Sequence, residues 1–219
     1  VIKISKIVYL TRDGHKISRL ANLTLPALLD LEMEHQKNIK AEPEGKLPSP
    51  VKKVYDHLSR LDWTKIDSIF KDQLYELKKE EYLNHFLIPI TQEMSLRSVE
   101  GKMDIIQEHI LSSLLKEYLY VLGKNNLPIK KKQKIKILYA TSEGDYHDLG
   151  LLICKVAAEI RGINCMYLGS HVPKKDLVEA CLRLKPTHVV LGTSVNAQNT
   201  VEENILKYVH FLDQHIPQN

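Results

Sequence analysis

The chain has 219 residues, a formal net charge of +4 and hydrophobic residues at 43% of its positions. This length suffices for one or two domains with an ordinary apolar core. The mild positive charge does not by itself indicate nucleic-acid binding. No apolar run approaches the roughly 18 residues that a membrane-spanning helix needs. No signal peptide is recognisable, so the sequence predicts a cytoplasmic protein that does not act at a membrane.

The reactive residue types give little sign of catalysis. Cys154, Cys165 and Cys181 lie at long, irregular spacings within apolar stretches, which argues against a zinc site and predicts small core residues in a reducing compartment. No nucleophile and base pair stands out, and no phosphate loop of the G-x-x-x-x-G-K type is present. Most histidines, among them His171, are scattered and predict ordinary surface or core positions. We therefore expect a protein that is not an enzyme by itself.

Residues 1–37 carry two short helical patterns of apolar residues. One helical face is indicated before Gly14 and a second series follows it, which together predict a helix, a turn and a short second helix. The apolar positions are Ile4, Ile7, Val8, Leu10, Ile17, Leu20 and Leu23. This pattern resembles the end of a MerR-type winged-helix DNA-binding domain, whose recognition helix and wing would precede Val1. The resemblance implies DNA as a partner, and a plain helical hairpin is the alternative.

Residues 38–50 read as a flexible linker and a domain boundary, because they hold three prolines and a glycine among few apolar residues. Residues 51–122 follow with helical spacing throughout. Asp62 is a suitable N-cap for a helix that begins at Trp63, which we expect to anchor the core. A third helix is expected over 82–91. Amphipathic helices with short joins predict a four-helix bundle.

A polar, basic linker over 123–133 leads into a domain over 134–219 with the pattern of a parallel α/β sheet. The expected strands are 135–141, 163–168 and 187–191, and the expected later helices begin at Pro173 and Thr200. The fold class is thus mixed α and α/β, with a helical bundle followed by a Rossmann-like, flavodoxin-like sheet domain. The chain ends where a fourth strand should begin, so we expect this domain to be incomplete at its C-terminus.

The loop after the first expected strand carries the spacing Asp145-x-His147-x-x-Gly150. Parallel sheets bind ligands at the carboxyl ends of their strands, where this loop lies. A histidine that binds a metal through one ring nitrogen needs a partner for the other, and Asp145 can supply it. Gly150 lets a large ligand pass close to the backbone at the start of the next helix. An ordinary surface histidine is the alternative.

The segment around this loop resembles the cobalamin-binding domain of methionine synthase and its relatives. The resemblance implies that His147 is the lower axial ligand of cobalt and that Asp145 accepts a hydrogen bond from it. It also implies that Ser194 closes the third strand near the buried nucleotide base. Thr200 would complete the hydrogen-bond relay with the aspartate and the histidine.

The whole chain resembles the cobalamin-dependent MerR-type repressors, which include light-responsive regulators of carotenoid genes. This implies a DNA-binding transcriptional regulator in which adenosylcobalamin, or another form, lies between bundle and sheet domain and controls a homo-oligomer, a dimer or tetramer. Glu108-His109 matches the Glu-His pair of the family's motif, so these residues, with Ile105, would line the upper face of the corrin. The motif's tryptophan falls at Ser98 and the histidine of light-responsive members at Val99, so we expect an altered upper pocket without the usual light response.

Two other functions stay open at this point. A corrinoid-carrying subunit of a methyltransferase system would suit the bundle and the sheet domain equally well. A MerR-type regulator that has lost cobalamin and acts through protein contacts would explain Ser98 and Val99. In that case Glu108 and His109 would lie on a solvated helix face.

Overall fold

The computed structural model describes residues 47–124, 135–193 and 200–216, with side chains from 205 onward in the last range, together with Thr24, Ala27 and Leu31. The chain divides into a unit of Val1–Leu47 and a unit of Pro48–Asn219. Every helix and strand named below belongs to the second unit. The winged-helix end predicted for 1–37, most of the predicted linker and Ser194 lie outside the described residues.

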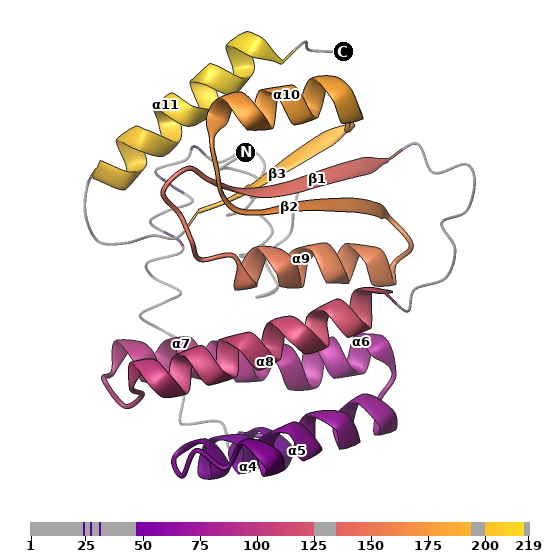
Figure 1. The fold of residues 1–219 in the computed structure, drawn as a ribbon, viewed down its shortest axis with the longest axis vertical. Coiled ribbons are helices and arrows are strands. Elements are labelled where there is room, and N and C mark those ends of the chain that lie inside the picture. The colour runs from indigo at the N-terminus through magenta and orange to yellow at the C-terminus, as the bar shows by residue number, and fades with distance from the viewer. Residues whose placement is uncertain are drawn as a thin grey trace. The chain divides into compact units, whose positions relative to one another are not determined.

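The first part of the second unit is a helical bundle, shown at the bottom of Figure 1. Its elements are α4 (Ser49–Leu58), α5 (Trp63–Glu76), α6 (Lys79–Tyr82), η1 (Leu83–Leu87), α7 (Ile88–Val99) and α8 (Ile105–Lys124). The carboxylate of Asp62 accepts a hydrogen bond from the backbone N–H of Lys65 at 3.3 Å, as its predicted N-cap role requires. The first helix begins at Ser49, two residues before the predicted start of the bundle and within ordinary boundary error.

The third predicted helix is longer than expected and contains a π-helical segment. Tyr82 and Ile88, at the two junctions, both have right-handed helical backbone angles, so α6, η1 and α7 form one continuous helix. Pro89 lies in the first turn of α7. A proline inside a regular α-helix lacks an N–H donor and collides with the carbonyl four residues earlier. The wider π turn directly before Pro89 is a place where such a residue is tolerated.

An aromatic cluster fills the bundle. Phe70 has its ring centroid 5.0 Å from that of Phe86 and 5.1 Å from that of Tyr118. Trp63 does not belong to this core: it is 44% exposed, so its prediction as a core anchor is wrong. Trp63 is the first residue of α5, and the stripe of that helix that faces the bundle begins at Ile66 instead.

The second part of the unit is a parallel sheet of three strands in the order β2-β1-β3. The strands are β1 (Lys136–Ser142), β2 (Asn164–Val172) and β3 (His188–Gly192), and the helices are α9 (Leu149–Ile160), α10 (Lys174–Leu184) and α11 (Thr200–His215). Figure 1 shows α9 on one face of the sheet and α10 with α11 on the other. The mixed α and α/β class predicted from the sequence is confirmed.

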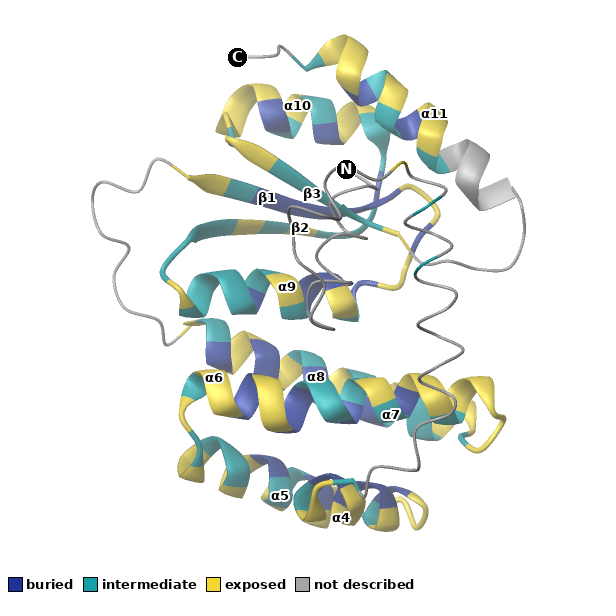
Figure 2. Ribbon diagram, turned by 180° about the vertical axis from the view of Figure 1, so that it is seen from behind, coloured by how far each residue is buried: buried dark blue, intermediate teal, exposed yellow. Residues whose placement is uncertain are grey.

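Burial is deepest along the central strand. Figure 2 shows β1 buried over most of its length, as expected for a strand covered on both faces. Tyr208 of α11 donates a hydrogen bond from its hydroxyl to the carbonyl of Val172 at 2.8 Å, which attaches α11 to the end of β2. Of the three cysteines, only Cys181 is buried, while Cys165 is half-buried and Cys154 is exposed. The prediction that all three are core residues is therefore wrong for Cys154.

The bundle and the sheet meet through α8, which packs against α9. One face of α8 contributes buried leucines to the bundle, including Leu111, Leu114 and Leu115. An exposed ion pair between Arg161, at the end of α9, and Glu80, in α6, also joins the two parts, with an N–O distance of 3.5 Å. Within the described ranges, none of the helices has both the length and the apolar character that crossing a bilayer demands.

Candidate functional site

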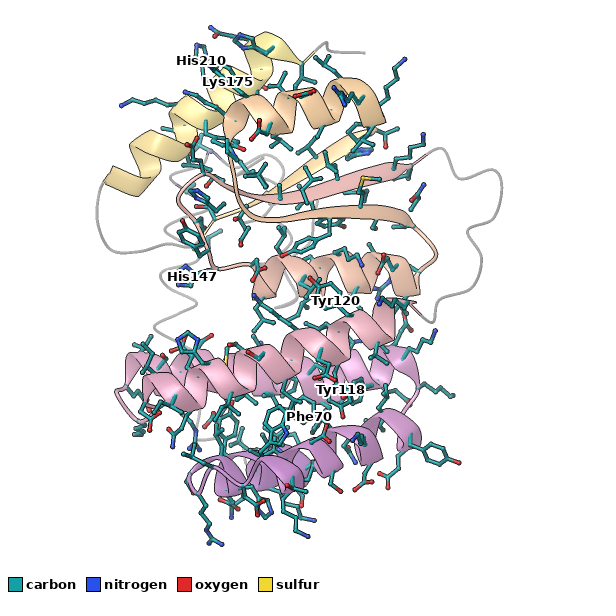
Figure 3. All side chains as sticks on the ribbon, in the orientation of Figure 1. Phe70, Tyr118, Tyr120, His147, Lys175 and His210 are labelled. Atoms are coloured by element: carbon teal, nitrogen blue, oxygen red, sulfur yellow. The ribbon has the colours of Figure 1, made fainter. Side chains whose placement is uncertain are left out.

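The loop of residues 143–148, here called the histidine loop, presents His147 at the carboxyl end of β1. The His147 side chain is 66% exposed, whereas that of Asp145 is only 8% exposed. Oδ1 of Asp145 lies 2.9 Å from the backbone nitrogen of His147 and 3.2 Å from its Nδ1. A carboxylate can only accept, so Nδ1 is the nitrogen that carries the proton. The lone pair of Nε2 is therefore available to another partner. Figure 3 shows the His147 ring outside the sheet layer.

Thr141 and His171 fix the backbone of the histidine loop. The fully buried Thr141 hydroxyl donates a hydrogen bond to the carbonyl of Asp145 at 2.5 Å. The His171 N–H donates to that same carbonyl and to Thr141 Oγ1, both at 2.9 Å. The Gly144 N–H donates to His171 Nδ1 at 2.7 Å, and Tyr146 stacks on the His171 ring at 4.7 Å. The loop therefore has a defined shape before any ligand arrives.

His171 is a residue that sequence reasoning missed. It was expected to be an ordinary surface or core histidine, yet it contacts the loop through both its main chain and its ring. Its φ is 54°, in the left-handed region that few residues other than glycine adopt. The only local signal was a histidine three residues beyond Leu168, where the expected strand ends, and no spacing rule connects that position to Gly144.

Asp148 follows His147 directly and is itself buried, with 7% exposure. One carboxylate oxygen lies 2.6 Å from Nζ of Lys116 in α8, and the other accepts a hydrogen bond from the Tyr167 hydroxyl in β2 at 2.5 Å. Burial, followed by the hydrogen bond to Asp148, raises the pKa of Tyr167 well above its usual value. The phenol therefore stays protonated and donates. Sequence reasoning did not select these residues either.

The other predicted residues of the sheet domain are only partly placed. Gly150 lies in the first turn of α9, and a Cβ built there would meet no other atom within 4 Å. The backbone at Gly150 is thus open to a large ligand, as the motif requires. Thr200 is the first residue of α11, but its side chain and all of Ser194 lie outside what the structure describes. Their roles stay predictions.

In the bundle, the predicted residues lie along the first turns of α8. Ile105, its first residue, is 69% exposed, and His109 is exposed as well. The carboxylate of Glu108 accepts a hydrogen bond from the Ser98 hydroxyl at 2.9 Å, and Val99 is 88% exposed at the end of α7. The structure thus pairs Glu108 with Ser98, the residue that aligns with the tryptophan of the motif that this segment resembles. Contact of these residues with a ligand stays a prediction.

The donor set decides which kind of metal could bind at His147. Among the described residues, no group of three or more His, Cys, Asp or Glu side chains could hold a metal ion. His147 alone supplies too few ligands for a bare cation, since protein sites commonly use three or four. One histidine with its second nitrogen on a buried carboxylate does suit a metal that arrives with its own equatorial ligands, such as the cobalt of a corrin.

The chain is similar to known proteins both in sequence and in fold. No protein-family profile matches the chain. Over 188 residues it is 25% identical to the HTH-type transcriptional repressor CarA of Myxococcus xanthus, covering 84% of this chain and 62% of the repressor. It is also 25% identical over 202 residues to CarH of the same organism, covering 88% and 64%. The chain therefore spans less than two thirds of the length of these relatives.

Among solved structures, the chain is similar to the monomethylamine corrinoid protein of Methanosarcina barkeri, with a TM-score of 0.54 and 18% identity. The superposition covers 74% of this chain and 76% of the corrinoid protein, and at this identity it establishes the fold alone. The resemblance predicted from the motif is confirmed at that level. The chain is similar in sequence to HTH-type transcriptional repressors and in fold to a corrinoid protein.

Proposed function

We propose that this chain is part of a DNA-binding transcriptional repressor and senses a cobalamin that binds at His147. The observation that supports this most is the pairing of an exposed imidazole with a buried carboxylate, His147 Nδ1 on Asp145 at 3.2 Å. Metal-binding histidines commonly donate their second N–H in this way, which fixes the tautomer and raises the basicity of the ring. The similarity to two transcriptional repressors supports the regulatory role.

Each residue of the histidine loop has a defined task in this proposal. When bound, a cobalamin would supply a cobalt centre with an exchangeable ligand. His147 would hold that cobalt through Nε2, because Asp145 keeps the ring in the tautomer that leaves Nε2 unprotonated. Gly150 leaves the start of α9 free for the part of the ligand that passes the backbone. Ser194 would lie near the nucleotide base, and Thr200 would complete the hydrogen-bond relay with Asp145 and His147.

Regulation would follow from linkage between ligand binding and oligomerisation. A ligand that binds one oligomeric state more tightly than another shifts the equilibrium toward that state, and the ratio of the two affinities sets the largest possible shift. A homo-oligomer, whether dimer or tetramer, could place two or more DNA-binding units on matching half-sites. Residues 1–37 would form the end of each DNA-binding unit in this scheme.

The upper side of the site would differ from that of the light-responsive family. Ile105, Glu108 and His109 would face the upper ligand from α8. The Ser98 hydroxyl donates a hydrogen bond to one carboxylate oxygen of Glu108. Val99 has no atom that can bind a metal. We propose that the protein senses the presence of a cobalamin and lacks the cobalt-capturing step that a histidine at position 99 would provide.

Absorption spectroscopy tests the cobalamin part of this proposal. The protein is mixed with hydroxocobalamin or adenosylcobalamin and desalted, and the visible spectrum of the protein fraction is recorded. We expect retention of at least one form with the shift that marks histidine coordination. His147→Ala should lose that shift. His210→Ala, an exposed histidine of α11, should not. Absence of any retained cobalamin on the unsubstituted protein would overturn the proposal.

A corrinoid-carrying subunit of a methyltransferase system is the second candidate, and the fold similarity to a corrinoid protein favours it. The two candidates differ in DNA binding. Fluorescence anisotropy with a DNA fragment from upstream of the protein's own gene, with and without cobalamin, separates them. Ligand-dependent binding supports the repressor, whereas cobalamin retention without any DNA binding supports the carrier.

A regulator that has lost cobalamin is the third candidate, motivated by Ser98 and Val99. It predicts that His147→Ala leaves both oligomerisation and DNA binding unchanged. Size-exclusion chromatography with light scattering, run with hydroxocobalamin present, measures the first property. A change of oligomeric state on that substitution would argue against this candidate.

A further inference from the structure

Asp148 contacts both parts of the unit next to the candidate cobalt ligand. Its carboxylate reaches α8 of the bundle through Lys116 and reaches β2 of the sheet through Tyr167. It is also the N-cap residue of α9, where an aspartate usually accepts a hydrogen bond from its own helix. Asp148 makes no such capping bond. The carboxylate is directed away from the helix end and across the interface instead.

The burial of this group distinguishes it from an ordinary surface ion pair. The Asp148 side chain is 10% exposed and that of Lys116 is 37% exposed. The other described ion pair between bundle and sheet domain, Arg161 with Glu80, has both side chains more than half exposed and an N–O distance of 3.5 Å. Exposed pairs contribute little, whereas removing one partner of a buried pair leaves a costly charge. The Lys116–Asp148 pair is therefore the stronger of the two connections.

Its position relates the two sides of the candidate site. Asp148 is the residue after His147, so its carboxylate and the imidazole belong to the same short loop. Lys116 lies in α8, the helix whose first turns carry Ile105, Glu108 and His109. A fixed contact between Lys116 and Asp148 therefore constrains the distance from the His147 ring to those turns.

We propose that Asp148, Lys116 and Tyr167 are positioning residues that set the spacing between the histidine loop and α8, and through it the fit of a corrinoid between them. The proposal rests on the proposed function for the identity of the ligand. It assigns no ligand contact to the three residues themselves. Because ligand binding at the histidine loop and the packing of α8 both depend on these contacts of Asp148, a change in one of them affects the other.

The test compares Lys116→Met with a matched control, Lys71→Met. Lys71 also lies 2.6 Å from an aspartate, Asp67, and that aspartate also accepts a hydrogen bond from a tyrosine, Tyr118 at 2.7 Å. The control pair belongs wholly to the bundle. Lys116→Arg is the conservative variant that can keep the ion pair, and Tyr167→Phe removes the second bond to Asp148.

Two measurements are made on each variant. Hydrogen exchange followed by mass spectrometry reports the amides of residues 143–150 in the ligand-free protein. Titration with hydroxocobalamin, followed by its absorption spectrum, reports affinity and histidine coordination. For Lys116→Met we expect faster loop exchange, affinity lower by about tenfold and a weakened histidine-bound spectrum. Tyr167→Phe should change both readouts in the same direction. The exchange rate and the affinity of Lys116→Arg should stay within about twofold of those of the unsubstituted protein. Lys71→Met should match the unsubstituted protein in both.

The outcomes separate this inference from the proposed function. If the unsubstituted protein binds no hydroxocobalamin, the proposed function fails, and loop exchange alone then decides whether the link exists. Faster exchange in Lys116→Met and Tyr167→Phe but not in Lys71→Met supports the link in that case. Equal loop exchange and equal spectra in Lys116→Met and Lys71→Met would overturn the inference, whatever the proposed function does.

Discussion

Replacing Thr141 by valine removes a hydroxyl from the base of the histidine loop and changes little else. The Thr141 hydroxyl donates to the Asp145 carbonyl and accepts from the His171 N–H. Those two partners also bond each other at 2.9 Å, so neither is left unsatisfied in the variant. Each lost hydrogen bond contributes about 0.5–1.5 kcal/mol, so the two together give a loss of about 1–3 kcal/mol in the free energy of unfolding. For a protein of this size, that lowers Tm by about 2–12 °C.

Thr141→Ser is the matched control, because it keeps the hydroxyl and removes a buried methyl group. That loss costs about 1 kcal/mol, so urea unfolding should show similar destabilisation for the two variants. Hydrogen exchange should distinguish them. We expect amides of the histidine loop to exchange faster in Thr141→Val and at an unchanged rate in Thr141→Ser. If both variants exchange alike, the hydroxyl is not what orders the loop, and the reasoning about its preformed shape is wrong.

Gly150→Ala should stabilise the ligand-free protein by up to about 1 kcal/mol in urea unfolding, because the added methyl meets no atom and alanine suits a helix better. The same variant should bind hydroxocobalamin more weakly, and unchanged affinity would contradict the close approach of a ligand to α9. Alkylation with iodoacetamide at pH 8, followed by mass spectrometry, should modify the exposed Cys154 before Cys165, because burial raises the pKa of the Cys165 thiol to about 11. The hydrogen bond from Lys71 lowers the pKa of Asp67 below its usual 3.8. The ionised Asp67 carboxylate therefore stabilises the fold above pH 3.8, and this stabilisation is lost as the pH falls through the lowered pKa. The difference in unfolding free energy between the unsubstituted protein and Asp67→Asn should accordingly shrink between pH 6 and pH 3, and a constant difference would contradict this assignment.

Features governed by neighbours in the sequence were predictable. The Asp62 N-cap, the strand before the histidine loop and the helix after it follow from turn chemistry and apolar spacing over a few residues. The aspartate partner of His147 was predictable for the same reason, since the two are separated by one residue. Rules that use only neighbouring residues thus identified His147 as the candidate metal-binding residue.

Features that depend on distant segments were not predictable from one sequence. Lys116, Asp148 and Tyr167 come from a bundle helix, a loop and a strand, and no spacing rule connects them. The interaction of His171 with Gly144 likewise joins the end of β2 to the loop that follows β1. The composition of a segment shows which side chains it carries but not which distant segment it will face. The groups that orient the ligand residue were for that reason harder to predict than the ligand residue itself.

The π-helical turn in the third helix has a consequence for how the length of this protein can vary. Its hydrogen bond from the Ile88 N–H to the Leu83 carbonyl spans five residues, one more than in an α-helix. A homologue with one residue fewer between these positions could close a regular turn and still direct Ile90 and Met94 inward. Pro89 would then lie in a regular helix, at a cost of about 3 kcal/mol. Shortened homologues should therefore have replaced the proline, whereas those of full length are free to retain it.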